Sequence, residues 1–297
     1  MSKQEVSNKV SSVIAREADG TIQITFTIPF PLIKKAKDET IVEMAKDVEV
    51  AGFRKGNAPL DKVAAKIPEN RLIEHSLGHL LPKALAESID EHKLKLTIYP
   101  KFELLKAKDN EDWEIRGTTC ELPKIDLGDY KKFVAAELRS SSIITSKPSD
   151  DADITAAQGR EKKEQAVIKA LIENIKFILP KILIEDEVTS RLSNLLARIE
   201  KLGLSLDSYL ASIGKTVESL RVEYEAQAKD AISLDIILTK ISDEEKLEVK
   251  PQEIEQALKM SQNASTTKNS ADVENKKRLF ESILKRRQAL DFLISLS

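Results

Sequence analysis

The sequence predicts an elongated two-domain protein, with an α+β N-terminal domain followed by an all-α C-terminal domain. Three observations support this fold class. Aromatic residues make up 4% of the 297 residues and charged residues 32%, a balance typical of long amphipathic helices with much solvated surface. Apolar and polar residues alternate in segments before residue 123, whereas everything after residue 153 has helical periodicity. Nine glycines also disfavour a turn-rich all-β fold.

The first elements are two strands joined by a tight turn. Residues 10–16 and 21–29 are rich in β-forming residues and flank Asp19-Gly20, a common hairpin signal. Residues 94–105 and 113–122 regain strand character on either side of the polar segment 108–112. These runs predict a small antiparallel sheet packed against helices. The second strand alternates strictly, so four apolar side chains should share one face: Ile22, Ile24, Phe26 and Ile28.

The sequence predicts three helices between these two pairs of strands. Pro29 and Pro31 end the second strand and suit the opening of a helix over residues 32–48. Two further helical stretches span residues 60–67 and 70–92. The side chains expected to face inward from the first and third helices are Ile33, Ala36, Thr40, Ile41, Met44, Val48, Leu72, Ile73, Leu77, Leu80, Leu81, Leu85 and Ile89.

The second half of the chain is predicted to be helical after a linker. Residues 140–158 are rich in serine and aspartate, with a helix N-cap expected at Asp151 or Asp153. Residues 262–269 are polar and are predicted to form a mobile loop. We therefore expect domains at 1–138 and 159–297, separated by a linker at 139–158. The helices are predicted over 154–179, 185–201, 206–213, 217–241, from 252 onward, and 272–296.

The most distinctive segment runs from Gly52 to Pro59 (Gly-Phe-Arg-Lys-Gly-Asn-Ala-Pro) and joins the first two helices. Gly52 and Gly56 permit the positive φ of a tight excursion, and Pro59 suits the start of the next helix. The tip therefore presents Phe53, Arg54 and Lys55 together. A ring and two cations suit a surface that carries carboxylates or phosphates. The alternative interpretation is an ordinary surface loop whose Phe53 covers a small local core.

Charge and composition narrow the classes of function. The net charge of −2 argues against general nucleic-acid binding, although residues 52–71 carry five cations and two anions. That local excess suits docking onto an acidic partner, and an ordinary mixed surface explains it equally well. The single cysteine, Cys120, fits a reducing compartment. The polar N-terminus and the lack of a run of ~18 apolar residues lead us to expect a soluble, cytoplasmic protein without a membrane partner.

The segment Gly52 to Pro59 resembles the ribosome-docking signature of trigger factor, a bacterial chaperone family that acts at the nascent-chain exit. That signature reads roughly Gly-Phe-Arg-x-Gly-x-x-Pro. The resemblance covers residues 10–138 as a ribosome-binding domain and resumes at residue 154 as the family's helical, SurA-like chaperone domain. In the latter, Pro180 precedes an acidic helix start at 185–187, as in the family. The residues that match the signature are Gly52, Phe53, Arg54, Gly56 and Pro59, and Lys55 is also common in the family.

The resemblance implies a ribosome-associated, ATP-independent chaperone that binds nascent or unfolded polypeptides at the tunnel exit and aids their folding. Its expected partners are a ribosomal protein at the exit, adjacent ribosomal RNA and unfolded clients. A weak homodimer is an open alternative. In such docking Phe53 would bury its ring, Arg54 would pair with a carboxylate or phosphate, and Lys55 would add charge.

Typical family members carry an FKBP-like prolyl isomerase domain between the two regions of resemblance. A compact domain needs at least ~50 residues, whereas residues 139–165 are mostly polar and contain no aromatic residue. We therefore predict that the isomerase domain is absent and that the protein is not an enzyme. Two alternatives stay open: a peptidyl-prolyl cis-trans isomerase, as family membership would suggest, and a holdase or assembly chaperone that works off the ribosome.

No other segment predicts catalysis, a cofactor or a metal. His75 and His79 lie four residues apart on one helix face, as metal ligands can. However, Ser76 stands where a zinc protease motif has Glu, and the surrounding leucines favour a plain packed helix. Cys120 has no cationic neighbours in sequence, so we expect a thiol packed in a strand.

Two basic triplets, at residues 276–278 and 285–287, lie on the last predicted helix. They could provide an auxiliary contact to RNA or to an acidic client. They could equally form a solvated helix face that balances an acidic partner helix, and this second interpretation is favoured.

Overall fold

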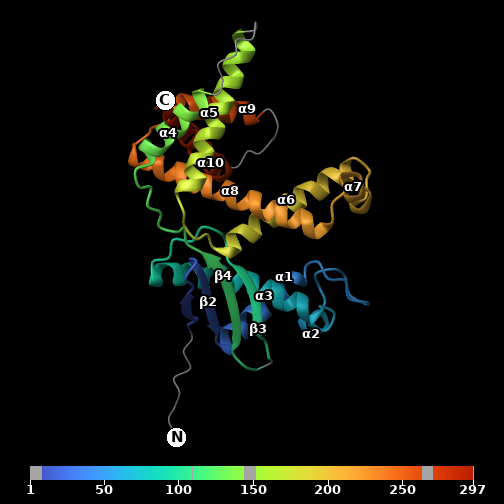
Figure 1. Ribbon diagram of the computed structural model, residues 1–297. Helices are drawn as coiled ribbons and strands as arrows, with labels where there is room; N and C mark the ends of the chain where they lie inside the picture. The colour runs from blue at the N-terminus through green and yellow to red at the C-terminus, as the bar shows by residue number, and fades with distance from the viewer. Residues whose placement is uncertain (1–8, 109, 144–151, 263–269, 297) are drawn as a thin grey trace. The chain divides into compact units, whose positions relative to one another are not determined.

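The computed structural model describes residues 9–108, 110–143, 152–262 and 270–296 (Figure 1). The chain packs as two compact units. Unit 1 comprises Met1–Leu122 with Pro180–Leu183, and unit 2 comprises Pro123–Leu179 with Ile184–Ser297. The compact units are defined by packing, whereas the predicted domains are defined by resemblance to a family, and the two need not have the same boundaries. The predicted domain boundaries 1–138, 139–158 and 159–297 therefore stay predictions. The predicted linker at 140–158 lies partly, and the predicted loop at 262–269 almost wholly, outside the described residues.

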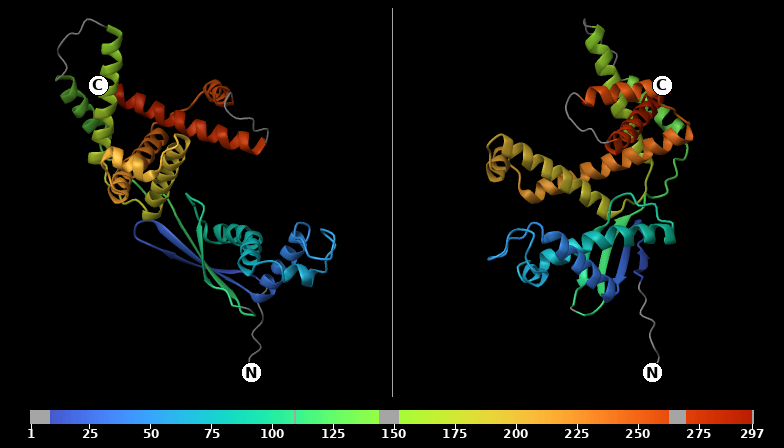
Figure 2. Two further views of the ribbon diagram at one scale, coloured as in Figure 1. Left: turned by 90° about the vertical axis from the view of Figure 1, so that its right-hand side faces the viewer. Right: turned by 180° about the vertical axis from the view of Figure 1, so that it is seen from behind.

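Unit 1 is built on a four-stranded antiparallel sheet with the strand order β1-β2-β4-β3 (Figures 1 and 2). Its strands are β1 (Ser11–Arg16), β2 (Thr21–Ile28), β3 (Lys101–Lys106) and β4 (Trp113–Cys120). The predicted small antiparallel sheet is thus confirmed. The prediction of strand over 94–100 is wrong, since only Leu96 forms an isolated bridge there, with Glu121. Pro100 lacks the N–H that a continued ladder would require.

One face of the sheet is buried against helices α1 (Phe30–Met44) and α3 (Glu69–His92). The four alternating residues of β2 predicted to share a face are each at most 1% exposed. Ile33 of α1 and Leu81 of α3 pack against Ile28, Trp113 and Ile115. The other face carries polar, partly exposed side chains from β2 and β4. This one-sided burial is what an alternating antiparallel sheet requires.

The chain between α1 and α3 folds over a small core of its own. α1 ends at Met44, four residues before its predicted end, and α2 spans only Leu60–Ala64. Val48 nevertheless packs as predicted, because it joins this core from the turn that follows α1. The buried members of the core are Met44, Ala45, Val50, Val63 and Ile67.

In its described residues, unit 2 consists of helices, as the sequence predicts. They are α4 (Tyr130–Ile143), α5 (Ala152–Asn174), α6 (Lys181–Lys201), α7 (Leu206–Ile213), α8 (Val217–Glu244), α9 (Pro251–Gln262) and α10 (Ser270–Ile294). α4 is not predicted, and α5 ends at Asn174 rather than at residue 179. One buried cluster draws on α4, α5, α8 and α10, with Leu138, Leu171, Ile241 and Leu293 at most 1% exposed.

The segment Pro180–Leu183, at the start of α6, packs with unit 1. The backbone N–H of Lys181 donates to Asp19 Oδ2 at 3.1 Å, and that of Thr21 donates to Asp19 Oδ1 at 2.9 Å. Asp19 therefore satisfies an N–H of the first turn of α6, as an N-cap side chain does. Partial burial acts to raise the pKa of Asp19, but the backbone hydrogen bonds outweigh it, so this pKa lies below its usual value.

Candidate functional site

The loop from Gly52 to Pro59 connects α1 to α2 and has the backbone geometry that its glycines predict. Gly52 has φ +87° and Gly56 has φ +84°, both in the region that favours glycine. The N–H of Phe53 donates to the carbonyl of Val50 at 3.1 Å, and that of Asn57 to the carbonyl of Arg54 at 2.9 Å. Two successive turns therefore fold the tip, and the three residues between the glycines project from it.

The base of this loop is anchored, whereas its tip is exposed. Val50 on one side is buried in the small core, and Ala58 on the other packs against it. Phe53 does not belong to that core, and 44% of its surface is exposed. The interpretation in which Phe53 covers a local core therefore does not describe this structure. A large exposed ring on an anchored loop is available to a partner.

The two cations of the tip differ in their surroundings. Lys55 Nζ lies 3.6 Å from Asp47 Oδ1, and both side chains are more than half exposed. Within the described residues, no carboxylate lies within 4.0 Å of the Arg54 guanidinium. Its five N–H donors are thus free to bind a carboxylate or phosphate in the bidentate manner that arginine favours.

Three further exposed cations follow the loop along the chain. Lys62 and Lys66 lie four residues apart, one on α2 and one in the turn after it, and Arg71 is in the first turn of α3. The spacing of Lys62 and Lys66 places them on the same side of this turn of helix. They extend the positive charge of the tip, as the local excess of cations in the sequence predicts.

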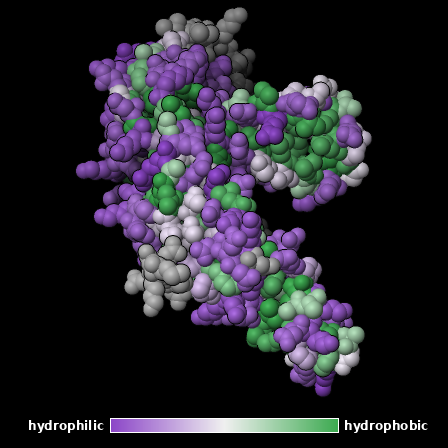
Figure 3. Space-filling view, turned by 90° about the horizontal axis from the view of Figure 1, so that it is seen from below, coloured by the Kyte–Doolittle hydropathy of each residue, from purple (hydrophilic) through white to green (hydrophobic). Residues whose placement is uncertain are grey.

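A second exposed surface lies on unit 2, and the sequence does not predict which residues form it. Large apolar side chains are exposed at the end where α6, α7 and the start of α8 meet, which is the hydrophobic region at the upper right of Figure 3. The only hint in the sequence is Leu202-Gly203-Leu204, an apolar pair at the end of a helix. The surface is formed by Leu196, Leu202, Leu204, Ile213, Val217 and Val222, which are 39–74% exposed.

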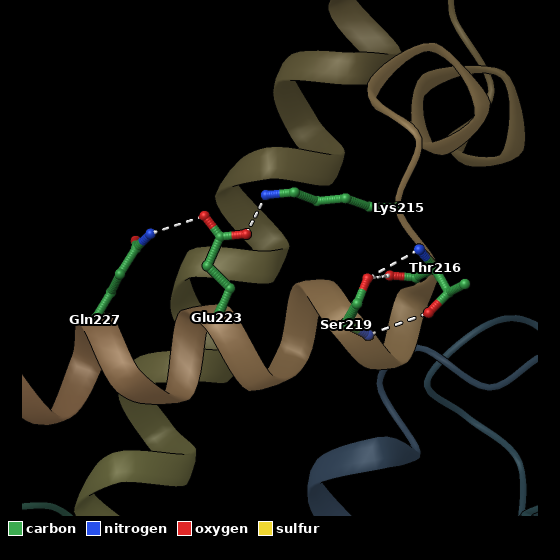
Figure 4. Close-up of polar contacts among 5 residues, drawn as sticks. All are labelled: Lys215, Thr216, Ser219, Glu223 and Gln227. Carbon is green, nitrogen blue, oxygen red and sulfur yellow. Dashed lines mark hydrogen bonds and ion pairs between the residues drawn. The ribbon is translucent and has the colours of Figure 1, made fainter.

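A network of polar contacts fixes the start of α8 beside this apolar surface (Figure 4). The side chain of Thr216 accepts from the N–H of Ser219 at 3.2 Å, and the side chain of Ser219 accepts from the N–H of Thr216 at 2.9 Å. This reciprocal capping box satisfies two backbone donors. Glu223 binds Lys215 through an ion pair and accepts from Gln227. The apolar side chains are therefore exposed on ordered backbone.

The two histidines and the cysteine considered as candidate site residues do not form a metal site among the described residues. His79 Nε2 lies 3.1 Å from Glu43 Oε2, and His75 is exposed on the same helix. No group of three or more potential metal ligands occurs among the described residues. Cys120 is fully buried in β4, as predicted. None of the described helices has both the length and the apolar composition needed to span a bilayer.

The basic triplets of α10 contribute to ion pairs, both within that helix and with α8. Arg278 lies 3.5 Å from Glu274, and Lys285 lies 2.9 Å from Glu281, both on α10 itself. Arg286 lies 2.6 Å from Asp235 of α8. The last pair is the kind of balance with a neighbouring helix that the favoured interpretation requires.

The comparisons with known proteins agree on one family. Residues 11–151 match the family model described as bacterial trigger factor protein, and residues 153–295 match the model of the bacterial trigger factor C-terminus. Trigger factors from Streptococcus agalactiae and Streptococcus mutans are each 33% identical to the chain over 143 residues. That stretch is 48% of this chain and 32% of each relative, so the alignment spans about a third of the curated relatives it matches.

A solved structure supports the fold. It was reported for promiscuous substrate recognition in folding and assembly by the trigger factor chaperone, and it superposes with a TM-score of 0.60 at 11% sequence identity. The superposition covers 96% of this chain and 99% of that chain. The two family models together account for nearly all of the sequence, in the family's order. The chain belongs to the trigger factor family.

Proposed function

We propose that this protein is a ribosome-associated, ATP-independent chaperone, which binds nascent or unfolded polypeptides at the tunnel exit and aids their folding. The observation that carries the proposal is the exposed tip of Phe53, Arg54 and Lys55, held by two positive-φ glycines. Family membership supports it, since the relatives from Streptococcus are named trigger factors and the similar solved structure is called a chaperone.

The loop would dock on an acidic patch of a ribosomal protein beside the tunnel exit. Phe53 would act as an anchor, because its exposed ring gains by leaving water. Arg54 would pair with a carboxylate at the centre of the contact, and Lys55 would increase the association rate through its charge. The exposed Lys62, Lys66 and Arg71 would add contacts to phosphates of adjacent ribosomal RNA.

Clients would bind to the exposed apolar surface of α6, α7 and α8. Scattered apolar side chains on an ordered backbone bind unfolded segments weakly and without strict sequence, because burial of apolar surface is not directional. Binding of this kind needs no nucleotide, since a client releases itself when folding buries its own apolar residues. A cytoplasmic location is part of the proposal.

Co-sedimentation with bacterial ribosomes tests the docking role. The triple variant Phe53→Ala, Arg54→Ala, Lys55→Ala should lose saturable binding while its circular dichroism spectrum is unchanged. The matched control, Tyr99→Ala, Lys108→Ala, Arg221→Ala, removes one aromatic ring, one lysine and one arginine from other exposed positions and should bind as the native chain does. Equal binding by both variants would reject the docking role of the loop.

The same triple variant separates docking from client binding. It should suppress the aggregation of a chemically denatured test protein as well as the native chain does, because its changes lie in unit 1 and the apolar surface lies in unit 2. A native chain that neither sediments with ribosomes nor suppresses aggregation would reject the proposed function as a whole.

A further inference from the structure

β1 lies at one edge of the sheet in unit 1. Among the described residues it pairs only with β2, in an unbroken antiparallel register from Ser11 opposite Thr27 to Arg16 opposite Ile22. An edge strand uses half of its backbone hydrogen-bonding groups within the sheet and directs the other half outward. The chemistry of this edge therefore depends on which residues face outward.

The hydrogen bonds of the adjoining turn identify those residues. The N–H of Glu17 donates to the carbonyl of Thr21 at 2.8 Å, so these two residues form a hydrogen-bonded pair that continues the register. Hydrogen-bonded and non-hydrogen-bonded pairs alternate along an antiparallel ladder. The N–H and C=O groups of Ser12, Ile14 and Arg16 therefore point away from β2. Among the described residues, no hydrogen bond to these groups is formed.

The two edges of the sheet differ in how well they are protected. β3, at the opposite edge, has a register shift between Leu104 and Lys106 and carries charges at Lys101 and Glu103. Bulges and charges are the usual means by which edges avoid pairing with other chains. β1 has no register shift, no proline and a charge only at its last residue, while Val13 is 70% exposed.

We propose that the free edge of β1 is a docking site for an extended segment of unfolded polypeptide, which adds to the sheet as a fifth strand. The inference rests on the proposed chaperone function and deepens it by assigning a second mode of client binding. Only an extended backbone presents donors and acceptors at the spacing that the outward groups of Ser12, Ile14 and Arg16 require.

The side chains around the edge specify the segment further. Ile14 is partly buried and packs, together with Val10, against the cluster that contains Ile22 and Ile24. An apolar side chain of the added strand would extend this cluster on the packed face. On the other face the strand would lie beside Ser11 and Val13, where small or polar residues suffice. The segment that fits best therefore alternates apolar and polar residues.

Residue-resolved amide exchange on the full chain tests the proposal, with the peptide acetyl-Lys-Thr-Val-Thr-Val-Thr-Lys-amide as the probe. The peptide should slow the exchange of the amides of Ser12, Ile14 and Arg16 about tenfold or more at saturation. The amides of Val13 and Ala15 should not change, because they already bond to β2. The same peptide with alternate residues N-methylated cannot pair as a strand and should slow none of them.

Two variants at one position separate the backbone contribution from the side-chain contribution. Ile14→Ala and Ile14→Pro both remove the apolar side chain, but only proline removes the outward N–H, and it leaves the bonds to β2 in place. Peptide binding should be about tenfold weaker in Ile14→Pro than in Ile14→Ala. Circular dichroism and ribosome co-sedimentation check that both variants are folded.

Three results would overturn the inference. Protection of the three amides without peptide, at any protein concentration, would mean that the chain covers its own edge. Protection that grows with protein concentration would assign the edge to a second copy. Peptide-induced protection elsewhere, or none, would leave the edge without a role.

Failure of this inference can be distinguished from failure of the proposed function. A chain that sediments with ribosomes and suppresses aggregation, but whose β1 amides are not protected by the peptide, rejects this inference alone. Protection of the β1 amides in a chain that has neither activity rejects only the proposed function.

Discussion

Glycine is required at positions 52 and 56 because of the backbone φ angle, and not because a side chain would collide with a neighbour. Both have φ near +85°, yet a Cβ on either would meet no atom within 4 Å. Alanine at either position should therefore cost roughly 1–2 kcal/mol through backbone strain alone, or bend the loop and weaken ribosome binding. Urea unfolding measures the first effect and co-sedimentation the second.

Gly78 provides the matched control for this prediction. It lies within α3 without a positive φ, and its Cβ would also meet open space. Gly78→Ala should stabilise unit 1 by about 0.5–1 kcal/mol, because alanine favours the helix. If the substitutions at 52 and 78 had the same effect, the glycines of the loop would not hold its geometry.

Glu245, which directly follows α8, joins that helix to α4 through its carboxylate. Tyr130 donates its hydroxyl to Glu245 Oε1 at 2.5 Å, and Lys131 Nζ lies 2.6 Å from the same oxygen. The ammonium of Lys131 also lies 5.4 Å from the ring centroid of Phe292 on α10. The hydrogen bonds from Lys131 and Tyr130 lower the pKa of Glu245 below its ordinary value of 4.5.

The lowered pKa of Glu245 predicts a pH-dependent contribution to stability. A carboxylate with a depressed pKa stabilises the folded state above its unfolded pKa, and this stabilisation is lost as the pH falls through the folded pKa. Glu245→Gln should therefore lower the free energy of unfolding by about 1–3 kcal/mol at pH 7. The difference from the native chain should shrink as the pH falls below 4.5. Urea unfolding at a series of pH values measures it.

The neighbouring Glu244 offers a control for that titration. It pairs with Lys240 at 3.9 Å while its side chain is 45% exposed, so Glu244→Gln should change stability little at any pH. A difference between the native chain and Glu245→Gln that stayed constant from pH 7 to pH 3 would contradict the assignment.

At the scale of single elements, the capping box at the start of α8 should determine how firmly the apolar surface of unit 2 is held. Thr216→Ala should cost about 1 kcal/mol and speed amide exchange in the first turn of α8. Thr239→Ala, an exposed change within the same helix, should be nearly neutral because alanine favours helix. Hydrogen exchange that did not differ between the two variants would show that the cap has no such role.

Much of the element structure follows from the sequence where a pattern is local. The alternation of apolar residues predicts β2, and the glycine after α7 predicts the end of that helix. Both signals depend on only a few neighbouring residues. α4 is not predicted, although Tyr130, Val134 and Leu138 recur every four residues and are buried. The end of α5 is not predictable from the pattern, because Ile175 and Leu179 continue the apolar spacing of the helix and are buried, yet they lie beyond it.

The candidate site also has features that the sequence predicts and features that depend on packing. The positive φ of Gly52 and Gly56 is predictable, since a motif with two glycines and a proline restricts its own backbone. The exposure of Phe53 is not, because the same sequence would suit a ring folded onto Val50 and Val63. The apolar surface of unit 2 is hidden for a similar reason. Leu202 and Val222 look like any other members of a helical stripe until the packing is known.

For the whole molecule, the two units have separate hydrophobic cores. Leu171 belongs to the large cluster of unit 2, and Ile24 to a cluster of unit 1, and both are fully buried. Leu171→Ala should lower the stability of unit 2 by about 2–5 kcal/mol and leave amide exchange in β2 unchanged. Ile24→Ala should do the reverse. Exchange that accelerated equally in both units for either variant would mean that they unfold as one.

The order of strands in the sheet has a consequence for synthesis of the chain itself. β2 lies between β1 and β4, yet α1, α2, α3 and β3 all separate it from β4 in the sequence. At the usual rate of elongation, roughly ten seconds pass between the completion of β2 and the arrival of its second neighbour. Throughout that interval β2 has only β1 to pair with, so we expect the apolar row from Ile22 to Ile28 to make this member of a chaperone family prone to aggregation while it is being made.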